Sequence, residues 1–153
     1  MTGCEICPIL ATQNNNKDVV VLETPHWRAV LDSDQRTLGK MFITLREHKA
    51  AISHLTVDEW TELHEVMRQL EEATSRAFSP SHFNWSCLMN NAIVAGQPTH
   101  VHWHFHPRYT QATEFSGEVF YDTELYPPKE RSAHPVSSEM LHSIAAVIQS
   151  HLK

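Results

Sequence analysis

Several features that would point to whole classes of protein are scarce in this chain. Its 153 residues include only three cysteines and four glycines. No apolar run approaches the roughly 18 residues of a membrane-spanning helix, and the first residues lack the apolar core of a secretion signal. An odd cysteine count without such a signal argues against a disulfide framework. We therefore expect a cytoplasmic protein with no membrane partner.

Positive charge is scarce as well. Lys and Arg number 12 against 18 Asp and Glu, which gives a formal net charge of -6. This balance does not favour nucleic acid or an anionic membrane surface, so an anionic ligand would have to be held by local groups. The length suits one compact domain, and we expect a single domain over residues 1–153 with a C-terminal extension over roughly 110–153.

Histidine, in contrast, is abundant, with 12 residues in the chain. Four of them alternate with apolar residues in His100-Val101-His102-Trp103-His104-Phe105-His106. A strand sends successive side chains to opposite faces, so the imidazoles share one face and the apolar residues form a core face. Imidazole ligates metals and also serves as nucleophile, acid or base near pH 7. The alternation alone leaves a catalytic site and a metal site equally open.

The remaining pattern predicts an α+β fold with an antiparallel sheet. Thr56 and Glu59 have the spacing of a capping box, and they precede a long amphipathic helix that ends at Ser79-Pro80-Ser81. A second amphipathic helix is expected over about 140–152. Residues 90–99 are predicted to be a loop and residues 110–131 irregular. The five predicted strands are residues 19–22, 27–31, 41–45, 84–89 and 100–108.

The segment from Met89 to Arg108 resembles the active-site segment of the histidine-triad (HIT) superfamily. Three of its histidines follow the family pattern His-φ-His-φ-His, where φ is apolar, and the loop Ala95-Gly96-Gln97 precedes them at the expected offset. Asn90 stands where the family has an amide side chain. The resemblance implies a HIT-like fold and a nucleotide hydrolase or transferase (Hint/Fhit-like). Two positions depart from the pattern, since His106 replaces an apolar residue and Pro98 replaces a serine found in some relatives.

The resemblance also implies a covalent mechanism on adenine nucleotides, either dinucleoside polyphosphates or nucleoside phosphoramidates. The middle histidine, His102, would attack the α-phosphorus, and water would release the mononucleotide from the resulting nucleotidyl-histidine. Asp32 would accept hydrogen bonds from the ribose, and Asn90 would orient the leaving group. The residues implied to take part in catalysis are His100, His102, His104 and Gln97. Those implied to bind the nucleotide are Asp32, Asn90, Gly96 and Gln97.

Cys4 and Cys7 form a Cys-x-x-Cys pair whose chemistry the sequence leaves open. A structural zinc ion needs four ligands, and a redox motif is favoured by a helix after the pair, whereas no helix-forming segment is predicted after Cys7. In some bacterial members of the family two histidines complete such a site, and the matching positions here are His48 and His100. The resemblance thus implies a structural zinc ion on Cys4, Cys7, His48 and His100, with no organic cofactor. Free thiols and redox activity remain the alternatives.

Two other classes of function stay open at this point. One is a transition-metal-binding protein that uses the histidine face from His100 to His106, and the other is a nucleotide-binding module with an inactive site. Analogy with the family suggests a homodimer, for which Trp60 and the region of the fourth strand are candidate contacts. The expected ligand is a purine nucleotide, with no nucleic acid.

Overall fold

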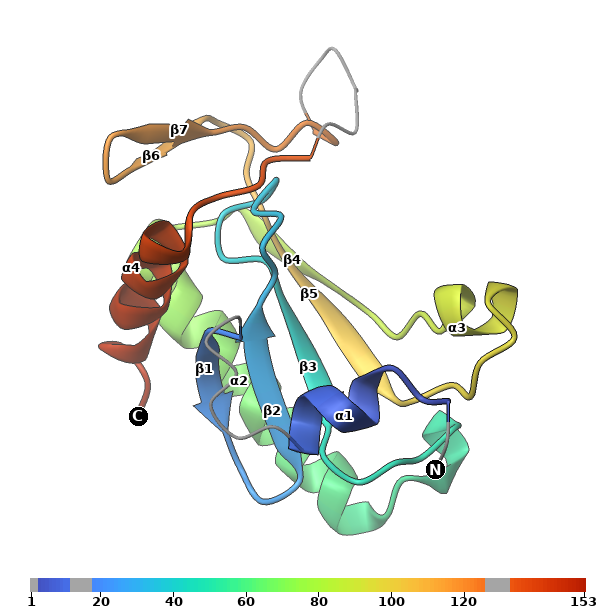
Figure 1. The fold of residues 1–153 in the computed structure, drawn as a ribbon. Helices are drawn as coiled ribbons and strands as arrows, with labels where there is room; N and C mark the ends of the chain where they lie inside the picture. Colours follow the sequence, from blue (N-terminus) through green and yellow to red (C-terminus); the bar gives the residue numbers. More distant parts are fainter. Residues whose placement is uncertain (1–2, 12–17, 126–132) are drawn as a thin grey trace.

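The computed structural model describes residues 3–11, 18–125 and 133–153. A five-stranded antiparallel sheet of order β1-β2-β3-β5-β4 forms its centre, and the long helix α2 and the short helix α1 lie on opposite faces of this sheet (Figure 1). The elements of the sheet are β1 (Val20–Glu23), β2 (Trp27–Leu31), β3 (Met41–Leu45), β4 (His82–Ser86) and β5 (His102–Arg108). The other elements are α1 (Ile6–Ala11), η1 (Ile52–His54), α2 (Val57–Phe78), α3 (Asn90–Val94), β6 (Thr113–Phe115), β7 (Glu118–Phe120) and α4 (Ser138–Gln149).

Strand β5 begins at His102, two residues later than predicted, so it carries three of the four alternating histidines, and it pairs with β3 on one side and β4 on the other. Its register sets His102 opposite Thr44 and His104 opposite Phe42 of β3. The side chain of Phe105 points to the other face and is completely buried in the core. The predicted division of this strand into a histidine face and a core face is confirmed.

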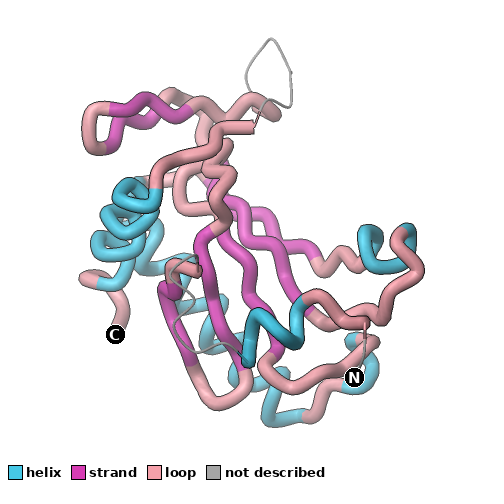
Figure 2. The backbone as a smooth tube through the Cα atoms, in the orientation of Figure 1, coloured by secondary structure: helices cyan, strands magenta, loops and turns pink. Residues whose placement is uncertain are grey.

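Helix α2 begins at the predicted capping box. The Glu59 backbone N–H donates to Thr56 Oγ1, and the Thr56 backbone N–H donates to a Glu59 carboxylate oxygen 2.6 Å away. The carboxylate is almost fully buried and also accepts from Lys49 Nζ at 2.6 and 2.7 Å. The buried residues of the helix are Glu59, Leu63, Val66, Leu70, Ala73, Thr74 and Phe78. Figure 2 shows α2 and α4 side by side, and α4 also contacts β1.

The expectation of no helix after Cys7 is wrong, because α1 covers Ile6–Ala11. Pro8 lies in its first turn, where the backbone N–H groups have no intrahelical partner, so proline does not disturb the helix there. Its apolar side chains Ile6, Ile9 and Leu10 line a pocket over the histidine face of the sheet, which the sequence pattern of so short a helix does not reveal.

Two segments predicted as loop or irregular chain contain short elements. Residues 90–99 include the one-turn helix α3, and residues 110–131 include the hairpin β6–β7. Ser116 and Gly117 both have positive φ, at 50° and 81°, which suits a two-residue hairpin turn. Strand β4 ends at Ser86, opposite His104, so residues 87–89 lead away from the sheet toward α3. Among the described residues, no helix is both long enough and apolar enough to span a bilayer.

Candidate functional site

Three histidines of β5 lie side by side on the sheet face that α1 covers in part. The ring centroids of His102 and His104 are 5.1 Å apart, and those of His104 and His106 are 6.2 Å apart. The ring of Phe42, from the neighbouring strand, meets His104 edge-on at 5.0 Å. The position of β5 inside the sheet and the contact between Phe42 and His104 hold the three rings in place.

A backbone hydrogen bond sets the tautomer of His102. Its Nδ1 lies 2.8 Å from the carbonyl oxygen of His100. A carbonyl oxygen only accepts, so Nδ1 carries the proton and donates it. In the neutral ring the lone pair is then on Nε2, and the side chain lines a cavity. This is the arrangement that a histidine nucleophile needs.

The two following histidines are biased toward the neutral form. Burial lowers the pKa of His104, and the neighbouring His102 lowers it further. Burial also lowers the pKa of His106 to about 4, with a further contribution from the charge of Lys40. The ring of His106 stacks on that of His104, with an angle of 15° between the planes. His106 does not line the cavity, so it supports His104 from the side.

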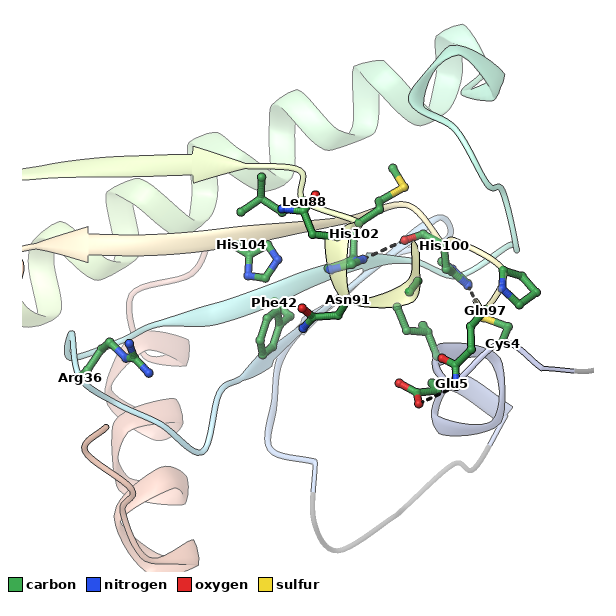
Figure 3. Close-up of a pocket in the computed structure, with 15 residues that line it drawn as sticks. Cys4, Glu5, Arg36, Phe42, Leu88, Asn91, Gln97, His100, His102 and His104 are labelled. Atoms are coloured by element: carbon green, nitrogen blue, oxygen red, sulfur yellow. Dashed lines mark hydrogen bonds between the residues drawn. The ribbon is translucent and has the colours of Figure 1, made fainter. Parts of the chain in front are cut away.

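A cavity of about 680 Å³ opens in front of His102 and His104 (Figure 3). Its walls come from the N-terminal segment, the connection between β4 and β5, and the loop between β2 and β3. Gln97 links the first two walls, since its Nε2 donates to a carboxylate oxygen of Glu5 at 2.9 Å. Gly96, with φ of +67°, turns the chain just before this glutamine, and the left-handed conformation favours glycine there.

Most of the predicted site residues meet at this cavity. His100, His102, His104, Asn90 and Gln97 all line it. Gly96 shapes the turn beside it without lining it.

Asp32, predicted to contact a ribose, lies outside the lining. One carboxylate oxygen is 2.7 Å from Lys40 Nζ, and the other accepts from the backbone N–H of Asp34 at 2.9 Å. The pattern of residues gave no sign that Arg36 of the same loop would line the cavity instead. Its guanidinium is held by the Asp34 carboxylate.

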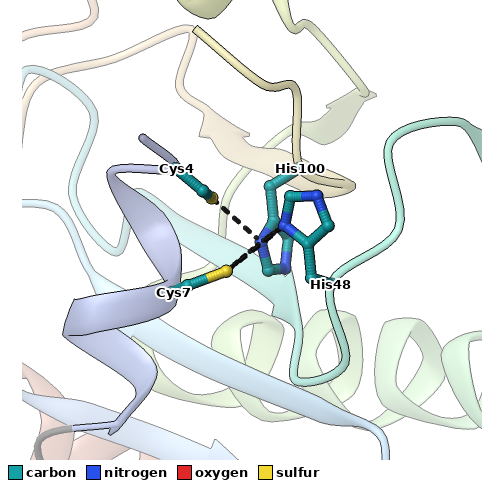
Figure 4. Close-up of side chains that lie close together, drawn as sticks. All are labelled: Cys4, Cys7, His48 and His100. Atoms are coloured by element: carbon teal, nitrogen blue, oxygen red, sulfur yellow. Dashed lines mark hydrogen bonds between the residues drawn. The ribbon is translucent and has the colours of Figure 1, made fainter. Parts of the chain in front are cut away.

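A second cluster gathers the four predicted metal ligands, as Figure 4 shows. The Cys4 and Cys7 sulfur atoms lie 3.5 and 3.6 Å from Nδ1 of His100. Nδ1 of His48 is 3.2 Å from the Cys7 sulfur and 3.3 Å from His100 Nδ1. Four ligand atoms within 4.8 Å of one another, from three separate segments, could share one ion.

These distances fit tetrahedral zinc. With Zn–S bonds of about 2.3 Å and Zn–N bonds of about 2.05 Å, the edges of a tetrahedron are ~3.6 Å from S to N and ~3.3 Å from N to N. The second ring nitrogen of His100, Nε2, lies 2.7 Å from the Leu45 carbonyl and therefore donates to it. That bond leaves the Nδ1 lone pair facing the sulfur atoms, as a metal ligand requires. His102, His104 and His106 belong to no such group of three or more potential ligands in the described part of the chain.

Comparisons with known proteins identify the family to which this architecture belongs. The HIT domain family matches residues 13–111, and the chain therefore belongs to the HIT family. A HIT family protein from Bacillus anthracis is 28% identical, with 99% of both chains covered and a TM-score of 0.59. The Plasmodium falciparum diadenosine triphosphate hydrolase is 16% identical over 90% of this chain and 77% of its own, with a TM-score of 0.60. A zinc-bound histidine triad family protein from Mycobacterium smegmatis is 13% identical over 97% and 91%, also at 0.60. No curated protein matches the sequence.

The family assignment confirms the predicted superfamily and fold class. The five-stranded antiparallel sheet, the long helix and the C-terminal helix are all present. Proteins of this family are in general nucleotide hydrolases or transferases, and the four-residue cluster suggests that this member binds zinc.

Proposed function

We propose that the protein is a nucleotidyl hydrolase or transferase that acts on the α-phosphate of purine nucleotides through His102. The observation that carries the proposal is the hydrogen bond from His102 Nδ1 to the His100 carbonyl, which leaves Nε2 free at the cavity wall. The resemblance of the active-site segment suggests adenine nucleotides as substrates, either dinucleoside polyphosphates or nucleoside phosphoramidates.

The reaction proceeds in two displacements. Nε2 of His102 attacks the α-phosphorus, a P–N bond forms, and the bond from phosphorus to the leaving group breaks, with the electron pair going to the leaving group. A proton from the site neutralises that group. Water then attacks the same phosphorus and gives one proton back to the site, and the P–N bond breaks with its electron pair returning to Nε2. The mononucleotide leaves with His102 restored.

The surrounding residues hold the phosphate and the leaving group. The backbone near Gly96 and the amide of Gln97 donate to phosphoryl oxygens, which stabilises the charge of the transition state. His104 donates to a phosphate or leaving-group oxygen, and Asn90 orients the leaving group. Asp32, which Lys40 binds through one carboxylate oxygen, accepts from the ribose hydroxyls with its remaining lone pairs.

A zinc ion on Cys4, Cys7, His48 and His100 has a structural role in this proposal. A bound zinc ion would cross-link three segments of the chain. With four protein ligands, it would have no coordination position open to a substrate. Cys4 and Cys7 anchor the N-terminal segment that forms one wall of the cavity. His100 is then a ligand and takes no part in proton transfer.

The test is a comparison of wild type, His102→Ala and His54→Ala on adenosine 5′-phosphoramidate and on diadenosine triphosphate. His54 is an exposed histidine away from the cavity and serves as the matched control. We expect His102→Ala to lose at least about 1000-fold in rate, because the covalent route is closed, and His54→Ala to keep full activity. Wild type quenched in alkaline denaturant should carry a nucleotidyl group on His102, because the P–N bond of a phosphorylated histidine is stable to alkali but not to acid. Undiminished activity of His102→Ala on both substrates would remove the proposed mechanism.

The homodimer is also a proposal. Strand β4 lies at an edge of the sheet, and Trp60 on α2 exposes 42% of its surface. Pairing of two β4 edges would continue the sheet across the interface and cover apolar surface. Light scattering of wild type and Trp60→Lys tests this, since a monomeric wild type contradicts the dimer and a monomeric variant identifies α2 as part of the contact.

A further inference from the structure

A smaller pocket of about 210 Å³ lies next to the cavity and shares His102 and Phe42 with it. Side chains of α1 and His102 of β5 both line it, so it lies between α1 and the histidine face of the sheet. Most of its wall is apolar and comes from Ile6, Ile9, Leu10, Val30 and Phe42. Two residues of opposite charge, Asp18 and Arg28, complete it.

Arg28 and the proposed nucleophile, His102, lie at matching positions in the strand register, two strands apart. The strand registers pair Arg28 with Thr44 of β3, and Thr44 with His102 of β5. Two strand spacings put the backbones of Arg28 and His102 about 10 Å apart on one face of the sheet. A nucleotide whose α-phosphate faces His102 can therefore extend its base over Thr44 toward Arg28.

Both charged residues have polar atoms without partners. Arg28 is 93% buried, because its exposed fraction is 7%. Its Nε and the Oδ2 of Asp18 are enclosed and have no hydrogen-bond partner in the part of the chain that the structure describes. A buried charge without full hydrogen bonding destabilises the fold, so such groups call for a functional explanation.

The composition of the pocket defines the ligand that would suit the parts of Arg28 and Asp18 that line it. The apolar wall fits a flat ring rather than a phosphate, which would lose its hydration among isoleucine and leucine and meet the Asp18 carboxylate. The ring must present hydrogen-bond acceptors to Arg28 and donors to Asp18. A nucleobase has this combination, and an aliphatic ligand does not.

We propose that Arg28 and Asp18 read the base and select guanine over adenine, an inference that rests on the proposed function. Guanine offers O6 and N7 as paired acceptors for a guanidinium, and N1–H and the 2-amino group as paired donors for a carboxylate. Adenine carries an amino donor in place of O6, so Arg28 would face a donor and keep an unpaired hydrogen. This inference replaces the adenine preference that the sequence resemblance suggests.

Calorimetry with mononucleotides tests the inference without any need for turnover. We expect wild type to bind GMP about tenfold or more tighter than AMP, the effect of one good paired contact. IMP, which keeps O6 and N1–H but lacks the 2-amino group, should bind between the two. Arg28→Met should weaken GMP about tenfold or more and leave AMP nearly unchanged, while Asp18→Asn should narrow the gap between GMP and IMP.

A stability measurement separates base reading from a structural role. Removal of an uncompensated buried charge should raise the melting temperature of the unliganded protein, so Arg28→Met should be more stable than wild type yet weaker for GMP. Arg46→Met is the matched control, because Arg46 is exposed and donates to the backbone carbonyls of Thr24 and Pro25. It should retain the wild-type preference for GMP. If Arg28→Met does not fold, Arg28→Lys replaces it and should lose the preference for the same reason.

The outcomes keep this inference apart from the proposed function. Equal binding of GMP and AMP by wild type, or an equal loss of both in Arg28→Met, overturns the inference. Turnover of guanosine and adenosine 5′-phosphoramidates at equal rates overturns it while the proposed function stands. A preference for GMP without turnover of either phosphoramidate supports base reading and contradicts the proposed hydrolase.

Discussion

Replacement of His106 by leucine should make the protein more resistant to acid. In the folded protein, burial and the charge of Lys40 hold the pKa of His106 at about 4, whereas a histidine in an unfolded chain has a pKa of about 6.5. Between these two values the unfolded chain binds a proton that the folded protein does not. The free energy of unfolding therefore falls as the pH drops from about 6.5 to about 4. Leucine carries no such proton.

The size of the effect follows from the shift. A difference of about 2.5 pKa units corresponds to at most about 3.4 kcal/mol, at about 1.36 kcal/mol for each unit. Solvent entry and side-chain movement on protonation reduce this, and we expect about 1–2 kcal/mol. Near pH 7 the His106 ring is neutral in both the folded and the unfolded protein. The difference in free energy of unfolding between wild type and variant at this pH therefore reflects only the packing of leucine against His104.

Urea unfolding at about pH 7.5 and about pH 4.5 measures this for wild type, His106→Leu and His54→Leu. The free energy of unfolding of His106→Leu, relative to that of wild type, should be higher at the lower pH than at the higher pH. His54 is exposed, and its variant should follow the wild-type pH dependence. The reasoning is refuted if the His106→Leu difference is the same at both pH values, or if NMR shows that His106 titrates near pH 6.5.

Three more predictions concern the metal cluster and the fold. Metal analysis should find one zinc ion per chain, lost in Cys7→Ser and kept in His102→Ala; loss of metal from His102→Ala would instead favour a metal site on the histidine face. Asp122→Asn should lower the free energy of unfolding by about 2 kcal/mol, because it removes the buried carboxylate 2.7 Å from Arg108 Nη2 and leaves that guanidinium to the partly exposed Glu124; a change under about 1 kcal/mol would contradict a buried pair. Thr56→Ala should cost about 1 kcal/mol through loss of the N-cap of α2, seen as a lower melting temperature, and an unchanged value would contradict the cap.

The sequence predicted best what depends on local chemistry. The alternation of β5 has a period of two, so the strand could only bury Phe105 and its apolar neighbours or bury the histidines. The capping box of Thr56 and Glu59 spans only four residues, and it marks the start of α2. The ligand set of the metal cluster came from the resemblance, since His48 and His100 lie far from Cys4 in the sequence.

What the sequence did not predict depends on tertiary contacts. Helix α1 is six residues long, too short for a clear apolar period, and isolated helices of this length are not stable by propensity alone. The hairpin β6–β7 had a local signal in the turn pair Ser116-Gly117, but its strands of three residues each are too short to show a clear alternation. The burial of Arg28 could not be foreseen, because it follows from the placement of α1 over β2.

His100 belongs to two sites at once. Its imidazole faces Cys4 and Cys7, while its carbonyl oxygen holds the proton of His102. A change that displaced this one peptide would therefore disturb the cysteine–histidine cluster and the tautomer of His102 together.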